Sequence, residues 1–153
     1  MKVSDLLVPI DFSPNSRRAV DFALSIIDED GDVYLLHVID SDFVDRLAED
    51  GFSDAPSATE RLRNRATERL EEIIAALPEP RPRIETMIVV GKPFAEILRV
   101  AADLDFQLIV MGAHGVRGQN LEELLFGSTA EKVLRAATIP VIFVPDSIEK
   151  AKQ

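Results

Sequence analysis

The chain has 153 residues, the length of a single domain, and hydrophobic residues make up 46% of it, which is enough for a core. Its net charge of −10 disfavours nonspecific binding to nucleic acid or to anionic membranes, because both need a basic surface. The absence of cysteine excludes disulfides and cysteine-based metal sites, and no apolar run is long enough to span a bilayer.

The first forty residues contain two short apolar runs with an amphipathic segment between them. Residues 6–10 show no polar alternation, which is typical of a strand buried on both faces. A helix is predicted after Ser13, which can cap it, and Pro14, which fits its first position. The apolar stripe of this helix comprises Ala19, Phe22, Ala23, Ile26 and Ile27. A second buried strand is predicted over 33–39, and His37 within it is expected to be a hydrogen-bonded core residue rather than a ligand.

The middle of the chain is less regular. Residues 40–56 are acidic, and we expect a mobile connection there that can include a short helix near 44–48. Ser57 and Glu60 match a capping box, so a long helix is predicted from residue 57 to the prolines that follow residue 77. A strand over 84–90 and a helix that begins at 91–93 follow. Lys92 is not assigned to a P-loop, because the G-x-x-x-x-G-K-[ST] pattern is absent.

A strand predicted over 106–111 leads into a loop that contains several glycines. Gly112 and Gly115 follow the strand, and Gly127 precedes a helix predicted from Thr129 to about Ala137. The backbone N–H groups of such a loop and the positive end of the helix dipole can form an anion site. The alternative is a connection that needs glycine only for its turns, and glycine spacing alone does not separate the two.

A last strand is predicted over 141–144. Strands that alternate with helices predict a single-domain α/β protein, a three-layer α/β/α sandwich around a five-stranded parallel sheet. Ligands of such sheets bind beyond the carboxyl ends of the strands, where the winding direction reverses. If the first and fourth strands are neighbours at that point, Asp11 and Gly112 face each other across the crevice.

Three stretches of the chain resemble the universal stress protein family. They are Leu7-Val8-Pro9-Ile10-Asp11-Phe12-Ser13, Leu35-Leu36-His37-Val38, and Val110-Met111-Gly112-Ala113-His114-Gly115 with Gly127-Ser128-Thr129-Ala130-Glu131-Lys132-Val133 and Ile139-Pro140-Val141. The resemblance implies a Rossmann-like fold of the adenine nucleotide alpha hydrolase-like type. Its sheet would have the strand order 3-2-1-4-5 within a domain of residues 1–146, followed by a polar tail, 147–153.

The resemblance also implies a homodimer. Family members commonly join through the last strand, which would otherwise be an unpaired sheet edge. Here that strand comprises Val141, Ile142, Phe143 and Val144. A further protein partner is expected but not identified. Because no signal peptide precedes the first apolar run, we expect a cytoplasmic protein.

Family members with this glycine motif often bind ATP, which implies ATP as the ligand, alone or with Mg²⁺ or Mn²⁺. By position, Asp11 and Val38 would hold the adenine and ribose end, and Met111 would lie near the ribose. Pro9 and Ile10 would shape that part of the pocket. The phosphates would be held by Gly112, Gly115, Gly127, Ser128 and Thr129. His114 is either a phosphate contact or a polar loop residue.

The glycine loop departs from the family motif in length. Eleven residues, 116–126, separate Gly115 from Gly127, which is two more than the motif has. Ser128 and Glu131 also fit a capping box, in which Ser128 satisfies the helix N–H groups that a phosphate would use. No side chain stands out as a catalytic base. The sequence therefore predicts a nucleotide-dependent switch or partner-binding module, with a nucleotide-independent adaptor or a slow ATP hydrolase as alternatives.

Overall fold

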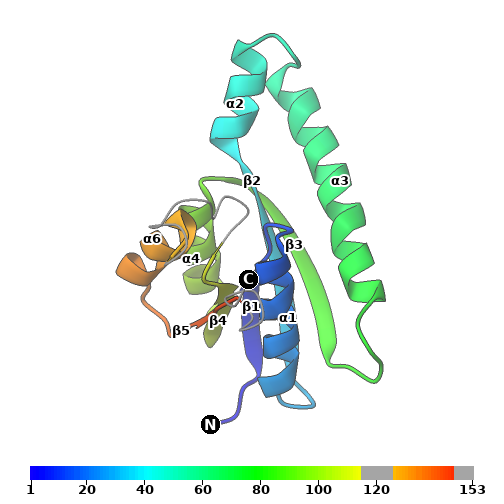
Figure 1. Cartoon of the computed structure of the whole chain (residues 1–153), viewed down its shortest axis with the longest axis vertical. Coiled ribbons are helices and arrows are strands. Elements are labelled where there is room, and N and C mark those ends of the chain that lie inside the picture. Colours follow the sequence, from blue (N-terminus) through cyan, green and yellow to red (C-terminus); the bar gives the residue numbers. More distant parts are fainter. Residues whose placement is uncertain (115–125, 147–153) are drawn as a thin grey trace.

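The computed structural model describes residues 1–114 and 126–146, in which five parallel strands form a sheet between two layers of helices (Figure 1). The strands are β1 (Asp5–Pro9), β2 (Asp32–Asp40), β3 (Arg83–Gly91), β4 (Leu108–Gly112) and β5 (Val141–Val144). The helices are α1 (Pro14–Ile26), α2 (Ser41–Glu49), α3 (Ala55–Ala75), α4 (Pro93–Asp103) and α6 (Ser128–Ala136). The strand order β3-β2-β1-β4-β5 confirms the predicted order and fold class.

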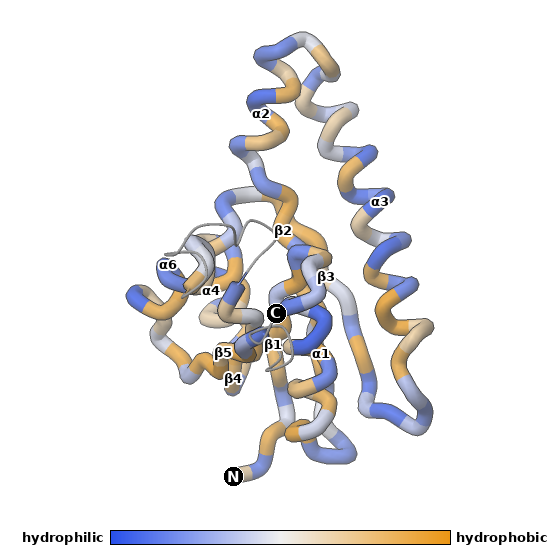
Figure 2. Tube along the Cα trace, viewed as in Figure 1, coloured by the Kyte–Doolittle hydropathy of each residue, from blue (hydrophilic) through white to orange (hydrophobic). Residues whose placement is uncertain are grey.

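Each face of the sheet has its own hydrophobic core, because the strands are apolar on both sides. Leu6 and Val8 of β1 pack on one face with residues of α1 and α3. Leu7, which points the other way, packs with residues of α4 and α6. Hydrophobic and hydrophilic residues alternate along α3, as expected of a helix with one buried face (Figure 2). Unbroken apolar strand sequences therefore reflect burial from both sides.

Helix α2 and the first turns of α3 form an arm that extends beyond the end of the sheet (Figure 1). A small hydrophobic cluster that includes Ile39 of β2, Val44 of α2 and Ala58 of α3 packs the two helices against each other and against the end of β2. The mobile connection predicted over 40–56 is wrong for 41–49, where α2 forms. Asp40 caps α2 by accepting a hydrogen bond from the N–H of Asp42. The short helix expected near 44–48 is thus present, and it is longer than expected.

The start of α3 also differs from the prediction. The helix begins at Ala55, and Asp54 is its cap, because its carboxylate accepts hydrogen bonds from the backbone N–H and the hydroxyl of Ser57. The capping box predicted at Ser57 is therefore wrong. Phe22 was predicted to lie in the buried stripe of α1, and this is wrong, because the residue is 38% exposed.

Several predictions concern residues outside the described ranges. Gly115, most of the longer glycine loop and the tail 147–153 are among them. Within the described residues, β4 begins at Leu108, two residues later than expected, and Phe106 before it is buried in the core. None of the helices in the described part of the chain is long and apolar enough to cross a bilayer.

Candidate functional site

A pocket of about 520 Å³ opens at the carboxyl ends of β1, β2 and β4. Its volume lies within the range of small-molecule sites, roughly 300 to 1,000 Å³. β1 pairs with β2 on one side and with β4 on the other, so the pocket lies where the winding reverses. The predicted site residues that line it are Pro9, Ile10, Asp11, Val38, Met111, Gly112, His114, Ser128 and Thr129. Asp11 and Gly112 thus lie on one crevice, as the topology argument predicted.

The Asp11 carboxylate is held in place by the turn that follows β1. Its Oδ1 accepts hydrogen bonds from the backbone N–H of Ser13 at 3.0 Å and from the Ser13 hydroxyl at 2.5 Å. Phe12 between them has a φ of 66°, in the left-handed region that residues other than glycine rarely adopt. Such conformations cost energy and concentrate at functional sites. The turn therefore fixes a carboxylate at the mouth of the pocket.

His37 of β2 supports the same turn. Its Nδ1 lies 2.8 Å from the carbonyl oxygen of Ile10, and because a carbonyl only accepts, Nδ1 carries the hydrogen. The His37 and Phe12 rings pack in a tilted arrangement, with their centroids 4.6 Å apart. The guanidinium carbon of Arg69 lies over the Phe12 ring, 4.1 Å from its centroid. Burial lowers the pKa of His37 below its usual value, although the Ile10 carbonyl and Asp11 oppose the shift. His37 is thus hydrogen-bonded, as expected, and also lines the pocket.

The opposite side of the pocket is the amino end of α6. Gly127 is the cap residue of this helix, and no side chain of the described residues caps it. Of the two interpretations of Ser128, the capping box is wrong, since Ser128 is already helical and the Glu131 carboxylate pairs with Arg135 instead. The N–H groups of the first turn, together with the Ser128 and Thr129 hydroxyls, remain for a ligand. Gly127 itself is not among the pocket-lining residues.

Asn15 connects the two sides of the crevice. Its side chain is 3% exposed; Oδ1 accepts a hydrogen bond from the N–H of His114 and Nδ2 donates one to the carbonyl of Val144. The first turn of α1 is thereby joined to both the glycine loop and the end of β5. An asparagine after Pro14 looks like an ordinary first-turn residue, so no sequence signal indicated this role.

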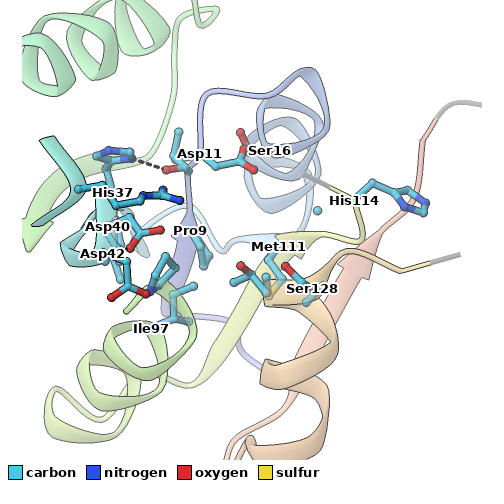
Figure 3. A pocket seen from close by; sticks show the side chains of 18 residues that line it. Pro9, Asp11, Ser16, His37, Asp40, Asp42, Ile97, Met111, His114 and Ser128 are labelled. Carbon is cyan, nitrogen blue, oxygen red and sulfur yellow. Dashed lines mark hydrogen bonds between the residues drawn. The ribbon is translucent and has the colours of Figure 1, made fainter. Parts of the chain in front are cut away.

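The third side of the pocket is formed by α2, which the sequence did not predict to contribute. Asp40, Asp42 and Arg46 line the pocket there. Figure 3 shows Asp40 and Asp42 on the side away from Ser128 and His114, with Asp11 between the two groups. The other lining residues that the sequence analysis missed are Ser16, Leu36, His37, Pro93, Ile97 and Ala130. The pocket therefore has a donor-rich end at α6 and an acidic end at α2.

Comparison with known proteins gives a consistent match. The profile of the universal stress protein family matches residues 3–145. The universal stress protein MJ0577 of Methanocaldococcus jannaschii is 32% identical, over 91% of this chain and 93% of the relative. A solved structure of protein MJ0577 superposes with a TM-score of 0.81 at 29% identity and covers 97% of this chain and 99% of its own.

Two more distant solved structures share the fold and contain adenine nucleotides. A universal stress protein in complex with cAMP has a TM-score of 0.64 at 21% identity and covers 96% of this chain and 100% of its own. A universal stress protein family member from Arabidopsis thaliana with AMP bound has a TM-score of 0.57 at 17% identity, over 96% of this chain and 94% of its own. At these identities, the likeness concerns the fold alone.

Proposed function

The chain belongs to the universal stress protein family, and on this premise we propose that it binds an adenine nucleotide in the crevice between β1 and β4. The nucleotide we propose is ATP, and the protein acts as a cytoplasmic, dimeric, nucleotide-dependent switch or partner-binding module. Distant relatives of the same fold with cAMP or AMP bound support an adenine nucleotide as the ligand class. They do not distinguish ATP from its shorter analogues.

The observation that carries this proposal is the polarity of the pocket. Its α6 end offers two hydroxyls and helix N–H groups that no side chain of residues 1–114 and 126–146 caps, and both suit an anion. Its centre is bounded by apolar side chains, including Pro9, Val38 and Ile97, which suit a flat base. The fixed carboxylate of Asp11 lies between, where a ribose hydroxyl could donate to it. The α6 end thus suits a phosphate, the Asp11 carboxylate suits a sugar, and the apolar side chains suit a base.

The proposed residue roles follow that order. Val38 and Asp11 bind the adenine and ribose, with Pro9 and Ile10 below the ring and Met111 near the ribose. The α phosphate lies against Gly112 and the first turn of α6, where Ser128 and Thr129 donate hydrogen bonds. Gly127, the cap residue of α6, has no side chain that would compete with a phosphate for the helix N–H groups. His114 contacts the phosphates from the loop.

A divalent cation would depend on the nucleotide for most of its ligands. Among residues 1–114 and 126–146, no three histidine or carboxylate side chains are grouped to hold a metal ion. Mg²⁺ usually keeps several waters and binds through phosphates with one or two carboxylates. Asp11 is the pocket carboxylate between the two ends and fits that limited role if the phosphates fold back toward it. Mg²⁺ or Mn²⁺ would offset phosphate charge in an acidic protein.

The proposed dimer uses the edge of the sheet at β5. This strand pairs with β4 alone in the described chain, and Val141, Ile142 and Phe143 are only half-buried. An edge of this kind is a template for pairing with a second chain, and natural proteins cover it. A second copy joined along β5 would bury those apolar side chains.

Thermal unfolding with and without nucleotide tests the proposed function. Millimolar ATP, ADP or AMP should raise the melting temperature, since ligand at a hundred times Kd adds about 2.7 kcal/mol of stability. If none of the three nucleotides shifts unfolding, nucleotide binding is rejected and a nucleotide-independent adaptor remains. Steady phosphate release that scales with protein under saturating Mg-ATP would instead indicate the hydrolase.

A further inference from the structure

The buried polar side chains of the described residues gather in one turn beside the pocket. In the part of the chain that the structure describes they are Ser13, Asn15 and Ser16, at 3%, 3% and 4% exposed. They form the cap and first turn of α1, directly after the turn that holds Asp11. Burying a polar group costs free energy unless it is hydrogen-bonded. Ser13 and Ser16 bond within this turn, whereas both partners of Asn15 lie far along the chain.

Asn15 holds the end of β4 to the end of β5. Its Oδ1 accepts a hydrogen bond from the N–H of His114 at 2.8 Å, and its Nδ2 donates one to the carbonyl of Val144 at 3.1 Å. The Val144 carbonyl also accepts from the N–H of Ala113 at 2.9 Å. The first two residues after β4 are therefore bound to one point at the end of β5, and the amide of Asn15 makes one of the two connections.

The same group of residues holds the start of α6. Gly127, the cap residue of this helix, donates its N–H to the carbonyl of Ala113 at 2.8 Å. The preceding residue, Phe126, packs edge-on against Phe143 of β5, with ring centroids 4.8 Å apart. No side chain of the described residues caps α6. These contacts, rather than a cap, therefore fix where the first N–H groups of α6 lie.

We propose that Asn15 is a positioning residue for the phosphate, because it fixes the end of β4 and, through Ala113, the start of α6 at the separation that a phosphate bridges. Gly112 and Ser128 line the pocket on these two elements, and Figure 3 shows Ser128 on the same side of the pocket as Met111. Asn15 is not a lining residue, so it acts through the backbone and not by touching the ligand. This inference rests on the nucleotide binding proposed above and adds the residue that sets the phosphate geometry.

The two ends of the pocket depend on Asn15 to different extents. A phosphate held by backbone N–H groups depends on their direction, because hydrogen bonds weaken steeply as they bend. The apolar residues proposed for the base lie elsewhere, Val38 on β2 and Ile97 on α4. Neither hydrogen bond of the Asn15 side chain reaches those elements. Loss of Asn15 should therefore weaken the contribution of the phosphate to binding and preserve that of the base.

The test measures the affinities for AMP and for adenosine, which lacks the phosphate, by chemical-shift titration of the full chain. The wild type should bind AMP at least about tenfold more tightly than adenosine, the lower limit for a hydrogen bond to a charged group. Asn15→Ala should reduce this ratio to about threefold or less and change the adenosine affinity by less than about twofold. A purely structural role would not change the ratio, because lower stability affects both ligands alike.

Gln107 provides a matched control at the opposite end of the sheet. Its side-chain amide also joins two backbone groups: Oε1 accepts from the N–H of Ser4 at 2.9 Å, and Nε2 donates to the carbonyl of Lys2 at 2.7 Å. These three residues precede β1 and β4, whose other ends form the pocket. Gln107→Ala removes the same two kinds of hydrogen bond and should leave the ratio of the two affinities unchanged.

Three results would overturn the inference while ligand binding stands. They are a ratio that Asn15→Ala leaves unchanged, a ratio that falls as far in Gln107→Ala, and equal affinity of the wild type for AMP and adenosine. Absence of binding of both ligands to the wild type rejects the inference together with the proposed function. If Asn15→Ala does not fold, Asn15→Ser supplies the same test, because its hydroxyl is one bond shorter and cannot replace both hydrogen bonds.

Discussion

The side-chain oxygen of Asn15 fills the space beside Gly112 in which any other residue would carry its Cβ atom. A Cβ built on residue 112 would lie 2.4 Å from Oδ1 of Asn15. The φ of Gly112 is not positive, so the glycine is required by this close approach and not by its own backbone conformation. At least one glycine of the loop therefore serves packing between α1 and β4, whether or not a phosphate binds nearby.

The first prediction follows from this contact. Gly112→Ala should destabilise the fold by about 1–3 kcal/mol, the usual cost of forcing an atom into a packed site. Asn15→Ala should cost a similar amount, because it removes the acceptor of the part-buried His114 N–H and one of the two donors to the Val144 carbonyl, which then keeps only the N–H of Ala113. The double variant should cost less than the sum, since the clash is gone. Urea unfolding measures all three, and strictly additive losses would contradict the contact.

A second prediction separates Ser128 from a capping role. Ser128→Ala should lower nucleotide affinity but leave the free energy of unfolding within about 0.5 kcal/mol, because Ser128 does not cap α6. Asp54→Ala is the matched control: it removes the carboxylate that caps α3 and should cost about 1 kcal/mol. An equal loss of stability in the two variants would restore the capping box at Ser128.

Asp11 gives the third prediction. Asp11→Asn keeps an oxygen that can accept from Ser13, so the turn should survive while the charge facing the ribose is lost. Affinity for AMP should fall about tenfold or more, as for a hydrogen bond to a charged group. Asp21→Asn, an equal charge change at an exposed position of α1 outside the pocket lining, should have no effect. Isothermal titration distinguishes a local effect from a loss of overall negative charge.

The fourth prediction concerns pH. The folded-state pKa of His37 lies below its unfolded value, because burial disfavours the charged ring. The unfolded chain therefore binds more protons as pH falls below the usual histidine value, and stability is lost progressively in that direction. Well above that pH, His37 is neutral in both the folded and the unfolded chain and does not contribute to the pH dependence of stability. Between pH 7.5 and 5.5, roughly the range around that value, His37→Gln should lose less stability than the wild type. Parallel losses of stability in urea unfolding would contradict a neutral, half-buried His37 in the folded state.

The β5 edge gives the fifth prediction. The carbonyls of Pro140 and Val144 accept hydrogen bonds from Ile109 of β4 and from Ala113 directly after it, so by strand alternation the N–H of Val141 faces away from the sheet. Val141→Pro removes that outward donor and leaves the pairing with β4 intact. The wild type should sediment as a dimer and the variant as a folded monomer. A wild type that remains monomeric at high protein concentration, or a variant that still dimerises, would count against pairing through β5.

Much of the fold could be predicted from the sequence because the strands are nearly continuous apolar runs. The runs around Leu7 and Val110 indicated strands buried on both faces, and their alternation with helices indicated the α/β class. Nine of the eleven predicted site residues line one pocket, because the carboxyl ends of neighbouring parallel strands meet at one edge. The strand order came from the family resemblance and not from the residues alone.

The missed residues share a physical reason. The roles of Asn15 and of the α2 residues depend on which element packs beside them, and nothing local in the sequence records that. In the sequence, Asp42 is indistinguishable from the other acidic residues of its segment, but the position of α2 brings it to the pocket. The capping boxes at Ser57 and Ser128 failed because the preceding residues, Asp54 and Gly127, take the cap positions. A local motif predicted a helix start correctly in each case but not the residue that caps it.

The central claim is that an adenine nucleotide occupies the crevice between β1 and β4, and amide chemical-shift mapping during an AMP titration tests it most directly. The account predicts saturable shifts for the amides of Asp11, Val38, Gly112 and Ser128, with the far ends of β1 and β4 unaffected. A spectrum that does not change with millimolar AMP, or one whose shifts gather away from these four amides, would contradict it.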